Sequence, residues 1–172
     1  SCAPSRAALL TGLMPARNGA EANHSKPRAE IKKLPAYLKE LGYEVVSFGK
    51  VSHYQHTGDY GFDHFAHDKF HEDIAVSAAI AWLRARRDAR PLCLFVGSNW
   101  PHVPWPATGE GYTAENVTVP ANHVDTPKTR EARATYYAAV GRMDRELGEV
   151  YDAAREVLGA ETFFVTSSDH GA

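Results

Sequence analysis

The stretch LPAYLKELGYEVVSFGK, residues 34–50, decides the fold, because a helix pattern, a turn and a strand pattern follow one another within it. Pro35 stands near the start of the helix, where its missing N–H is not needed, and Gly42 stands where helices commonly stop. The strand pattern at 44–48 is short and almost continuously apolar. This order predicts one helix–strand unit of an α/β fold.

The same order of helix, turn and strand recurs twice further along the chain. Residues 73–88 repeat apolar groups at helical spacing, and an apolar strand pattern at 92–96 follows them. The longest helix pattern begins at Thr126-Pro127, where Thr126 suits the N-cap and Pro127 the first turn, and it stops at Gly159. A third strand pattern follows at 162–166. Short apolar strands separated by helices predict an α/β fold with a mostly parallel sheet sandwiched by helices.

Polar side chains follow each of the three strand patterns. Lys50 comes after the first, Asn99 and His102 after the second, and Asp169 and His170 after the third. In parallel sheets, ligands bind beyond the carboxyl ends of the strands. The sequence therefore predicts a site at that edge of the sheet.

Composition excludes several classes of protein. The chain has 172 residues, 44% of them hydrophobic and 23% charged, which is typical of a globular protein. A net charge of −2 gives no reason to expect nucleic acid as a partner, and no apolar run reaches the length of a membrane span. The two cysteines differ in context: Cys93 lies in an apolar run and is expected in the core. A Cys2–Cys93 disulfide stays open at this point.

The N-terminal run Cys2-Ala-Pro-Ser-Arg6, followed by Ala-Ala-Leu-Leu-Thr-Gly12, is the most informative motif of the chain. Pro4 suits the first turn of a helix, so the pattern predicts a helix over 4–11 with Cys2 at its mouth. The unpaired N–H groups and the positive dipole end at a helix start hold anions. A cysteine placed there is a low-pKa nucleophile or the precursor of a more reactive group.

This run resembles the sulfatase signature, C-x-P-S-R followed by x-x-L-L-T-G, and the resemblance extends over essentially the whole chain. It implies a formylglycine-dependent sulfatase of the alkaline-phosphatase superfamily, with an alkaline-phosphatase-like fold that is incomplete in this chain. Residues 116–120 and 136–144 look most like the heparan N-sulfatase (sulfamidase) branch. The forms Cys-Ala-Pro-Ser-Arg and Gly-Lys-Val-x-His look more like the iduronate-2-sulfatase branch.

The resemblance implies roles for five residues. In this family a maturation enzyme oxidises the cysteine to formylglycine, so Cys2 would become the nucleophile. One hydroxyl of the hydrated aldehyde would attack sulfur, and the second hydroxyl would then expel sulfate. Arg6 would hold the modified residue, Lys50 would contact a sulfate oxygen, and His53 would hydrogen-bond the formylglycine hydroxyl. His102, in the Pro-His-x-Pro segment, would contact sulfate or the leaving oxygen and is a candidate general acid.

The segment around Asp169 and His170 resembles the family's metal-binding Ser-Asp-His/Asn-Gly. It implies a divalent cation held by Asp169, His170 and the modified Cys2, with calcium first and magnesium or manganese open because a histidine is among the ligands. The family's Asp–Asp pair before the nucleophile and its later sulfate-binding lysine have no counterpart here. We therefore expect an internal fragment of one catalytic domain, residues 1–172, truncated at both ends and inactive in isolation.

The predicted function is hydrolysis of a sulfate ester or sulfamate on a sulfated sugar or glycosaminoglycan, in the periplasm or outside a bacterial cell, or in a eukaryotic lysosome. One alternative is a phosphatase or phosphodiesterase of the same superfamily. Another is a non-catalytic carbohydrate-binding protein, in which Trp100 and Trp105 would stack on sugar rings; both could equally lie in the core. Four further histidines could suggest zinc, but we expect them at the surface or in a substrate pocket: His56, His64, His67 and His71.

Overall fold

The computed structural model describes residues 1–171. They form two compact units, the first made of residues 1–98 together with the chain from Ala153 on, and the second of residues 99–152. Among the described residues, none of the helices combines the length and the apolar composition needed to cross a bilayer. The sheet lies entirely within the first unit.

A three-stranded parallel sheet forms the centre of the first unit, in the order β2-β1-β3. The central strand β1 (Glu44–Gly49) pairs with β3 (Leu92–Gly97) on one side and with β2 (His64–Ala66) on the other. The expected strands at 44–48 and 92–96 are confirmed, each one residue longer. The sequence analysis missed β2, because three residues are too few to show an alternating or apolar pattern.

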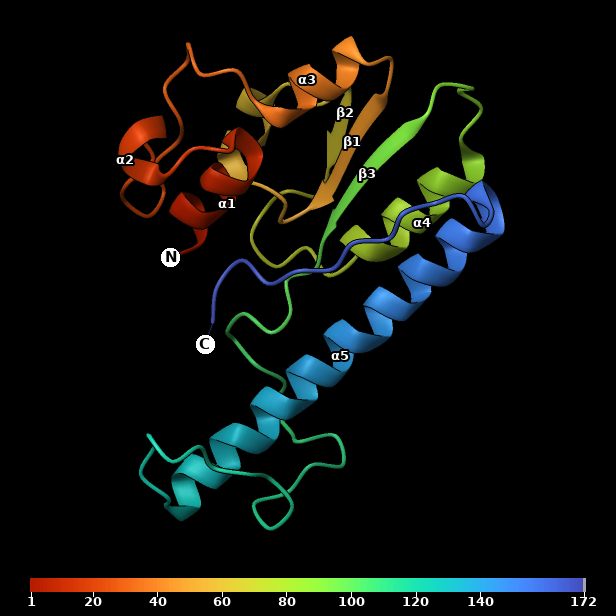
Figure 1. Cartoon of the computed structure of the whole chain (residues 1–172). Helices are drawn as coiled ribbons and strands as arrows, with labels where there is room; N and C mark the ends of the chain where they lie inside the picture. Colours follow the sequence, from red (N-terminus) through yellow and green to blue (C-terminus); the bar gives the residue numbers. More distant parts are fainter. Residues whose placement is uncertain (172) are drawn as a thin grey trace. The chain divides into compact units, whose positions relative to one another are not determined.

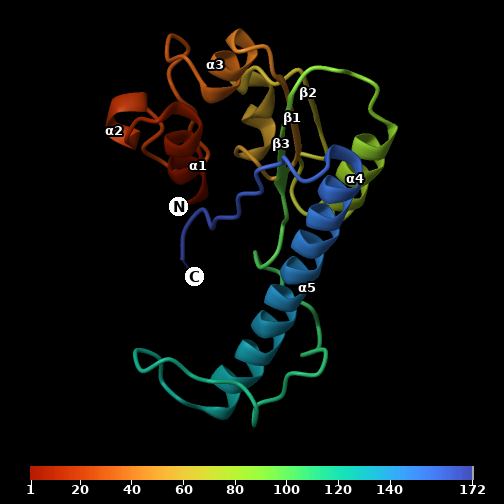
Figure 2. The ribbon, with the colours of Figure 1, turned by 45° about the vertical axis from the view of Figure 1, so that its right-hand side comes forward.

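Helices cover both faces of the sheet, as the sequence predicts. α1 (Cys2–Thr11) and α3 (Leu34–Glu40) lie on one side of the strands, and α4 (Ala75–Ala85) lies on the other (Figures 1 and 2). A short helix, α2 (Pro15–Asn18), follows α1, and a 3-10 helix, η1 (Tyr54–Tyr60), follows β1.

Alternate residues of β1 serve two separate cores, because successive side chains of a strand point to opposite faces. Val45 packs with Leu10 of α1 on one face. Val46 and Phe48 pack with Ala79 of α4 on the other. All of these side chains are almost completely buried, so the sheet is held from both sides by the hydrophobic effect.

The helix expected at 4–11 is confirmed as α1, and its ends follow local rules. Pro4 lies in the first turn, and the chain leaves the helix at Gly12 with φ +68, a left-handed conformation that glycine adopts without steric cost. The N–H of Gly12 donates to the carbonyl of Ala8, which closes the last turn. This start of α1 fixes Cys2 at the edge of the first unit's core.

The strand expected at 162–166 is wrong. These residues follow the last helix as extended chain without a strand partner, and Phe163 and Val165 are 98% and 86% exposed. A strand needs a neighbour for its N–H and C=O groups, and within residues 1–171 no strand pairs with this segment.

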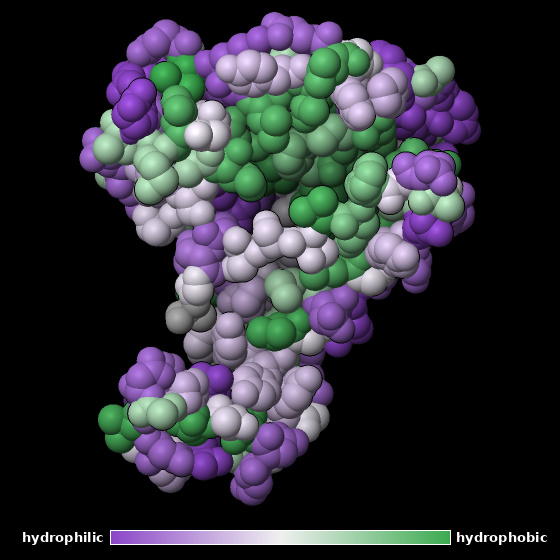
Figure 3. Space-filling model, in the orientation of Figure 1, coloured by the Kyte–Doolittle hydropathy of each residue, from purple (hydrophilic) through white to green (hydrophobic). Residues whose placement is uncertain are grey.

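Apolar residues also gather at the surface over the strands (Figure 3), where all of β3 is only partly buried.

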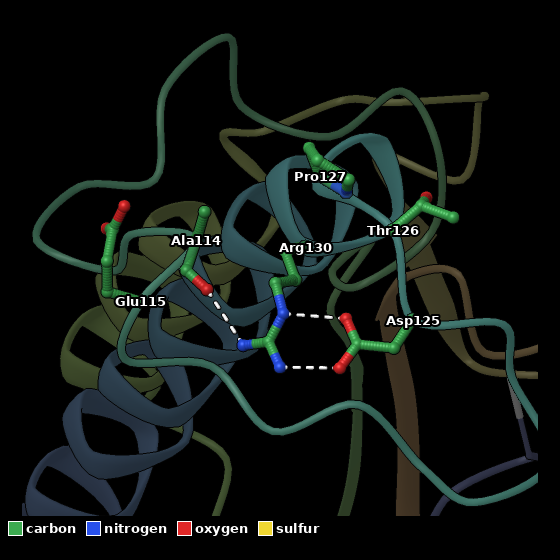
Figure 4. A pocket seen from close by; sticks show the side chains of 6 residues that line it. All are labelled: Ala114, Glu115, Asp125, Thr126, Pro127 and Arg130. Carbon is green, nitrogen blue, oxygen red and sulfur yellow. Dashed lines mark hydrogen bonds and ion pairs between the residues drawn. The ribbon is translucent and has the colours of Figure 1, made fainter.

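The second unit contains most of α5 (Pro127–Leu158), whose start is the one expected from the sequence. Thr126 accepts a hydrogen bond from the Thr129 N–H at 3.1 Å, a side-chain cap of the first turn. Beside it, an open depression is lined by residues of the preceding loop and of this first turn (Figure 4). Arg130 in this depression is already bound to Asp125 through two hydrogen bonds of 2.6 Å.

Candidate active site

The side chain of Cys2 lies between two groups from distant parts of the first unit. The Lys50 ammonium donates to Cys2 Sγ at 3.4 Å, and His170 Nε2 lies 3.2 Å from the same sulfur. Lys50 follows β1, and His170 arrives on the extended segment after α5, which runs back toward the start of α1 (Figure 1). Cys2, Lys50 and His170 therefore come together as the sequence predicts, although the third expected strand does not form.

The Cys2 thiol and the His170 imidazole lie at hydrogen-bond distance from each other. His170 Nδ1 donates to the Gly171 carbonyl at 2.6 Å, so Nε2 either accepts the thiol proton or, as imidazolium, donates to a thiolate. Partial burial raises the pKa of the Cys2 thiol, but the His170 hydrogen bond and the Lys50 charge outweigh it and the pKa is lowered. The hydrogen bond to Cys2 raises the pKa of His170. The geometry thus favours deprotonation of the group at position 2.

Arg6 ties this cluster together. Its Nε donates to Asp169 Oδ2 at 2.9 Å, and its Nη1 donates to the carbonyls of Lys50 and, at 3.2 Å, of Val51. Ser5 of the same helix donates to the backbone carbonyl of Asp169. Burial alone would raise the pKa of the Asp169 carboxyl, yet the Arg6 charge and other nearby cations lower it. Arg6 therefore holds the segment carrying Asp169 and the end of β1 against α1.

Two glycines set the position of Lys50. Gly49 has φ +73, and a Cβ built there would lie 2.2 Å from the Gly97 carbonyl oxygen. A Cβ on Gly97 would lie 2.2 Å from the Lys50 carbonyl oxygen and 2.9 Å from its backbone nitrogen. The Lys50 N–H donates to Gly97 O at 3.0 Å. The backbones at the ends of β1 and β3 can approach this closely only because Gly49 and Gly97 have no side chains. This close contact directs Lys50 toward the site.

The Lys50 side chain is buried, and its surroundings act on the pKa of its ammonium in both directions. Its residue is only 4% exposed, and burial lowers the pKa of its ammonium, with the Arg6 charge acting in the same direction. Cys2 and Asp169 act in the opposite direction. A buried cation pointed at an anion-binding helix start is the arrangement needed for a negatively charged ligand.

His53 is buried beside the cluster. It is 5% exposed, and burial together with the nearby His24 and Lys50 lowers its pKa to about 4. Its Nδ1 has no hydrogen-bond partner among the described residues, and no hydrogen bond joins it to Cys2 within residues 1–171. Its ring packs edge-on against His24 and Tyr54, at 4.6 and 4.8 Å between centroids. The expected contact of His53 with the nucleophile stays a prediction.

His102, Trp100 and Trp105 belong to the second unit, whereas the cluster around Cys2 lies in the first. His102 Nδ1 donates to the Val103 carbonyl at 2.6 Å. The Arg142 guanidinium lies 4.9 Å from the Trp100 ring centroid, and Trp105 Nε1 donates to the Pro101 carbonyl at 2.9 Å. Both tryptophans are half-buried, and the core and the stacking interpretations both stay predictions.

The expected metal ligands lie together. One donor atom each from Cys2, Asp169 and His170 lies within 4.8 Å of the others, the single such group found among residues 1–171. A sulfur or oxygen, a carboxylate and an imidazole can share one divalent cation, but six to eight ligands are usual for calcium, so this set is incomplete. Four histidines form no such group in the described residues: His56, His64, His67 and His71.

Cys2 and Cys93 are both free thiols, so the disulfide left open by the sequence does not form. Cys93 packs partly buried against the core on the α1 side of the sheet, and burial raises its pKa. This contrast leaves Cys2 as the reactive thiol of the chain.

Sequence reasoning did not single out Tyr54, His24 or Gly97, all of which contact predicted site residues. Tyr54 directly follows His53, and Gly97 ends an apolar strand pattern. For both residues, their position next to a motif was the sequence feature that could have indicated a place in the site. His24 had no such signal, because a turn of the chain brings it to His53 from a loop far away in sequence.

Comparison with known proteins agrees with this geometry. The sulfatase family model matches residues 1–172. An ulvan-active sulfatase from Formosa agariphila is 32% identical over 177 residues, covering 99% of this chain and 35% of that protein. Human N-sulphoglucosamine sulphohydrolase is 28% identical, with 99% and 41% covered, and mouse iduronate 2-sulfatase is 24% identical, with 99% and 46% covered. The chain thus spans between a third and a half of these relatives.

Solved structures show the same fold. A Bacteroides thetaiotaomicron protein described with the metabolism of multiple glycosaminoglycans superposes with a TM-score of 0.73 at 18% identity, covering 90% of this chain and 46% of that one. A protein solved in complex with a neocarrahexaose gives a TM-score of 0.61 at 19% identity, covering 91% and 45%. The expected α/β fold with a parallel sheet between helices is therefore confirmed, and the chain belongs to the sulfatase family.

Proposed function

We propose that the protein to which this chain belongs hydrolyses a sulfate ester or a sulfamate of a sulfated sugar, with Cys2 converted to formylglycine by a maturation enzyme. The observation that carries this proposal is the placement of the Lys50 ammonium and the His170 imidazole against Cys2 Sγ, at the N-terminus of α1. A formylglycine at this position supplies, once hydrated, a hydroxyl nucleophile and a second hydroxyl that releases sulfate.

The residues around position 2 would bind and orient the sulfuryl group. The Lys50 ammonium offsets negative charge on a non-bridging oxygen, and the α1 N-terminus adds the partial positive charge of its free N–H groups. His170 Nε2 lies at hydrogen-bond distance from position 2, where it would ligate a cation together with the group at that position. Arg6 donates hydrogen bonds to the Asp169 carboxylate and to the carbonyls of Lys50 and Val51, and these bonds keep the Asp169 side chain and the Lys50 backbone in place.

Two further histidines have proposed roles. His53, held neutral by its low pKa, would accept a hydrogen bond from the group at position 2 through Nδ1, which has no partner among residues 1–171. His102 would protonate the leaving oxygen as the general acid. This role requires residues 1–172 to be part of one catalytic domain, which we also propose.

We propose a divalent cation, calcium first, held by Asp169, His170 and the group at position 2. Bound there, it would supply positive charge next to the sulfate oxygens. Replacing the soft thiol by an oxygen ligand makes the donor set harder and better suited to calcium.

The names of the relatives support a sulfated sugar as the substrate. They refer to activity on ulvan, on N-sulphoglucosamine and on iduronate. We propose the same chemical class here. Assays on ulvan oligosaccharides, N-sulfated disaccharides and 2-O-sulfated disaccharides would separate the branches.

The decisive test uses the full-length protein, produced together with a formylglycine-generating enzyme. Peptide mass spectrometry is expected to find an aldehyde in place of the Cys2 thiol, and sulfate release is expected from at least one sulfated saccharide. Cys2→Ser should lower release to background, because a serine side chain cannot expel sulfate by elimination. Cys93→Ser is the matched control and should retain activity. An unmodified Cys2 in a protein that hydrolyses phosphate esters would instead support the phosphatase alternative.

The metal proposal has a readout other than activity. Chelation should lower the melting temperature of the full-length protein and added calcium should restore it, because an ion bound only by the native state stabilises that state. Asp169→Asn should abolish the calcium-dependent shift. A shift that persists unchanged in this variant would place the cation elsewhere.

A further inference from the structure

Tyr54 is a side chain of the site that the mechanism above does not use. It directly follows His53 and opens η1. The Lys50 Nζ lies over its ring, 5.1 Å from the centroid. His53 and Phe70 pack edge-on against the same ring, at 4.8 and 5.7 Å. The ring is therefore packed against two neighbouring rings, and the ammonium lies over it.

Tyr54 is kept in this place at a conformational cost. Its φ is +40, a left-handed backbone conformation that is unfavourable for a bulky aromatic residue. Its hydroxyl is buried and finds no hydrogen-bond partner among residues 1–171. Strained backbone and an unsatisfied buried group persist where the surrounding structure requires them, and both are concentrated at functional sites.

The contact with Lys50 is a reason for the strained backbone and the unsatisfied hydroxyl of Tyr54. Lys50 is 4% exposed, so water does little to stabilise its charge or to fix the direction of its long side chain. The negative face of an aromatic ring attracts an ammonium at this distance, more strongly when both are removed from water. Burial and the nearby charge of Cys2 raise the pKa of Tyr54 to about 12, so the ring acts as a neutral phenol and not as a phenolate counter-ion.

We propose that Tyr54 is a positioning residue, whose ring holds the Lys50 ammonium against the side chain at position 2. The ring limits the directions open to the ammonium, so that Nζ stays within hydrogen-bond distance of position 2. On the function proposed above, the same contact aims Lys50 at a sulfate oxygen. Only this last step rests on the proposed function.

The first test reads Lys50 directly and needs no activity. The full-length protein is treated with a limiting amount of acetic anhydride, and acetylation of each lysine is followed by peptide mass spectrometry. Lys26, which is exposed and paired with Asp59, is the internal control. Tyr54→Leu removes the ring and should raise labelling of Lys50 several-fold relative to Lys26. Tyr54→Phe keeps the ring and should label like the wild type.

The hydroxyl provides a matched check. Because it is buried without a partner, Tyr54→Phe should leave the melting temperature unchanged or raise it. The proposal is overturned if Tyr54→Leu leaves Lys50 labelling unchanged relative to Lys26. It is equally overturned if Tyr54→Phe raises labelling as much as Tyr54→Leu does, since the ring would then not be the cause.

The second test addresses the step that rests on the proposed function. In active full-length protein, Tyr54→Leu should lower kcat/KM by about tenfold, and Tyr54→Phe should lower it much less. In a Lys50→Met background, Tyr54→Leu should add no further loss, because the ring acts through the ammonium. Additive losses would contradict the proposal. If the wild type releases no sulfate from any substrate while the labelling result holds, the proposed function fails and the positioning role stands.

Discussion

Two arginine–aspartate pairs of this chain use the same chemistry in different surroundings. In the second unit, Arg130 binds Asp125 through two hydrogen bonds of 2.6 Å (Figure 4), and the partners are five residues apart. In the first unit, Arg6 binds Asp169 through one hydrogen bond of 2.9 Å, and the partners are 163 residues apart. By length and number of hydrogen bonds, Arg130–Asp125 is the better pair.

Burial reverses that ranking. The Arg6 and Asp169 side chains are 15% and 22% exposed, whereas those of Arg130 and Asp125 are 34% and 50% exposed. Water and salt screen the exposed pair, so it contributes little beyond fixing a loop to the first turn of α5. The shielded Arg6 also binds backbone carbonyls after β1, so its loss would leave several acceptors unpaired. Bond geometry alone does not show which pair holds a site together.

The largest expected difference comes from removing each arginine. Arg6→Gln should lower the free energy of unfolding of the full-length protein by about 2–4 kcal/mol, because it leaves a shielded carboxylate without its cation. It should also abolish sulfate release. Arg130→Gln should leave activity intact and move the melting temperature little. Denaturant unfolding and a sulfate-release assay check both, and equal losses would show that burial does not separate the pairs.

A smaller effect is expected from the backbone contact that supports Lys50. Gly97→Ala should destabilise the protein by about 1–3 kcal/mol, because its Cβ would collide with the Lys50 backbone, and kcat/KM should fall as Lys50 moves. Gly148→Ala, in α5 with no atom within 4 Å of the new Cβ, should stabilise by roughly 0.5–1 kcal/mol through helix propensity. A Gly97→Ala variant with normal stability and kcat/KM would contradict this account of the strand ends.

Acid should weaken the first unit through His53. Its pKa is lowered from 6.5 to about 4, so between these values the unfolded state binds more protons than the native state. Stability is therefore greatest above pH 6.5 and is lost as pH falls toward 4. His53→Gln should flatten this part of the curve of unfolding free energy against pH. An unchanged slope in the variant would assign the acid sensitivity to other groups.

The smallest expected effect is on the exposed pair itself. At about 1 M salt the screening length is about 3 Å, so the coupling between Arg130 and Asp125 in a double-mutant cycle should fall toward zero. The coupling between Arg6 and Asp169 should change less, because solvent reaches it less. Melting temperatures of the single and double variants at low and high salt measure both couplings. Equal salt sensitivity would remove the distinction drawn here.

Local sequence signals predicted the elements that depend on neighbouring residues. Pro4 marks the first turn of α1 and Gly12 its end, and Thr126 caps α5. Continuous apolar runs form β1 and β3. The run at 162–166 carries the same apolar signal but forms no strand. Its failure has a physical cause: a strand is stabilised by its partner, and composition does not report whether a partner is present.

By itself the sequence determined α1, α3, α4 and α5, two of the three strands and the chemistry of the residues at the site, because propensity, capping and motif spacing act over a few residues. Only the tertiary structure decided that Asp169 and His170 meet Arg6 and Cys2, that β2 joins the sheet, and that the Tyr54 ring lies under the Lys50 ammonium. These contacts join segments that are far apart in the chain or depend on backbone conformations that local propensity disfavours. They form because packing on the two faces of β1 fixes where the chain returns.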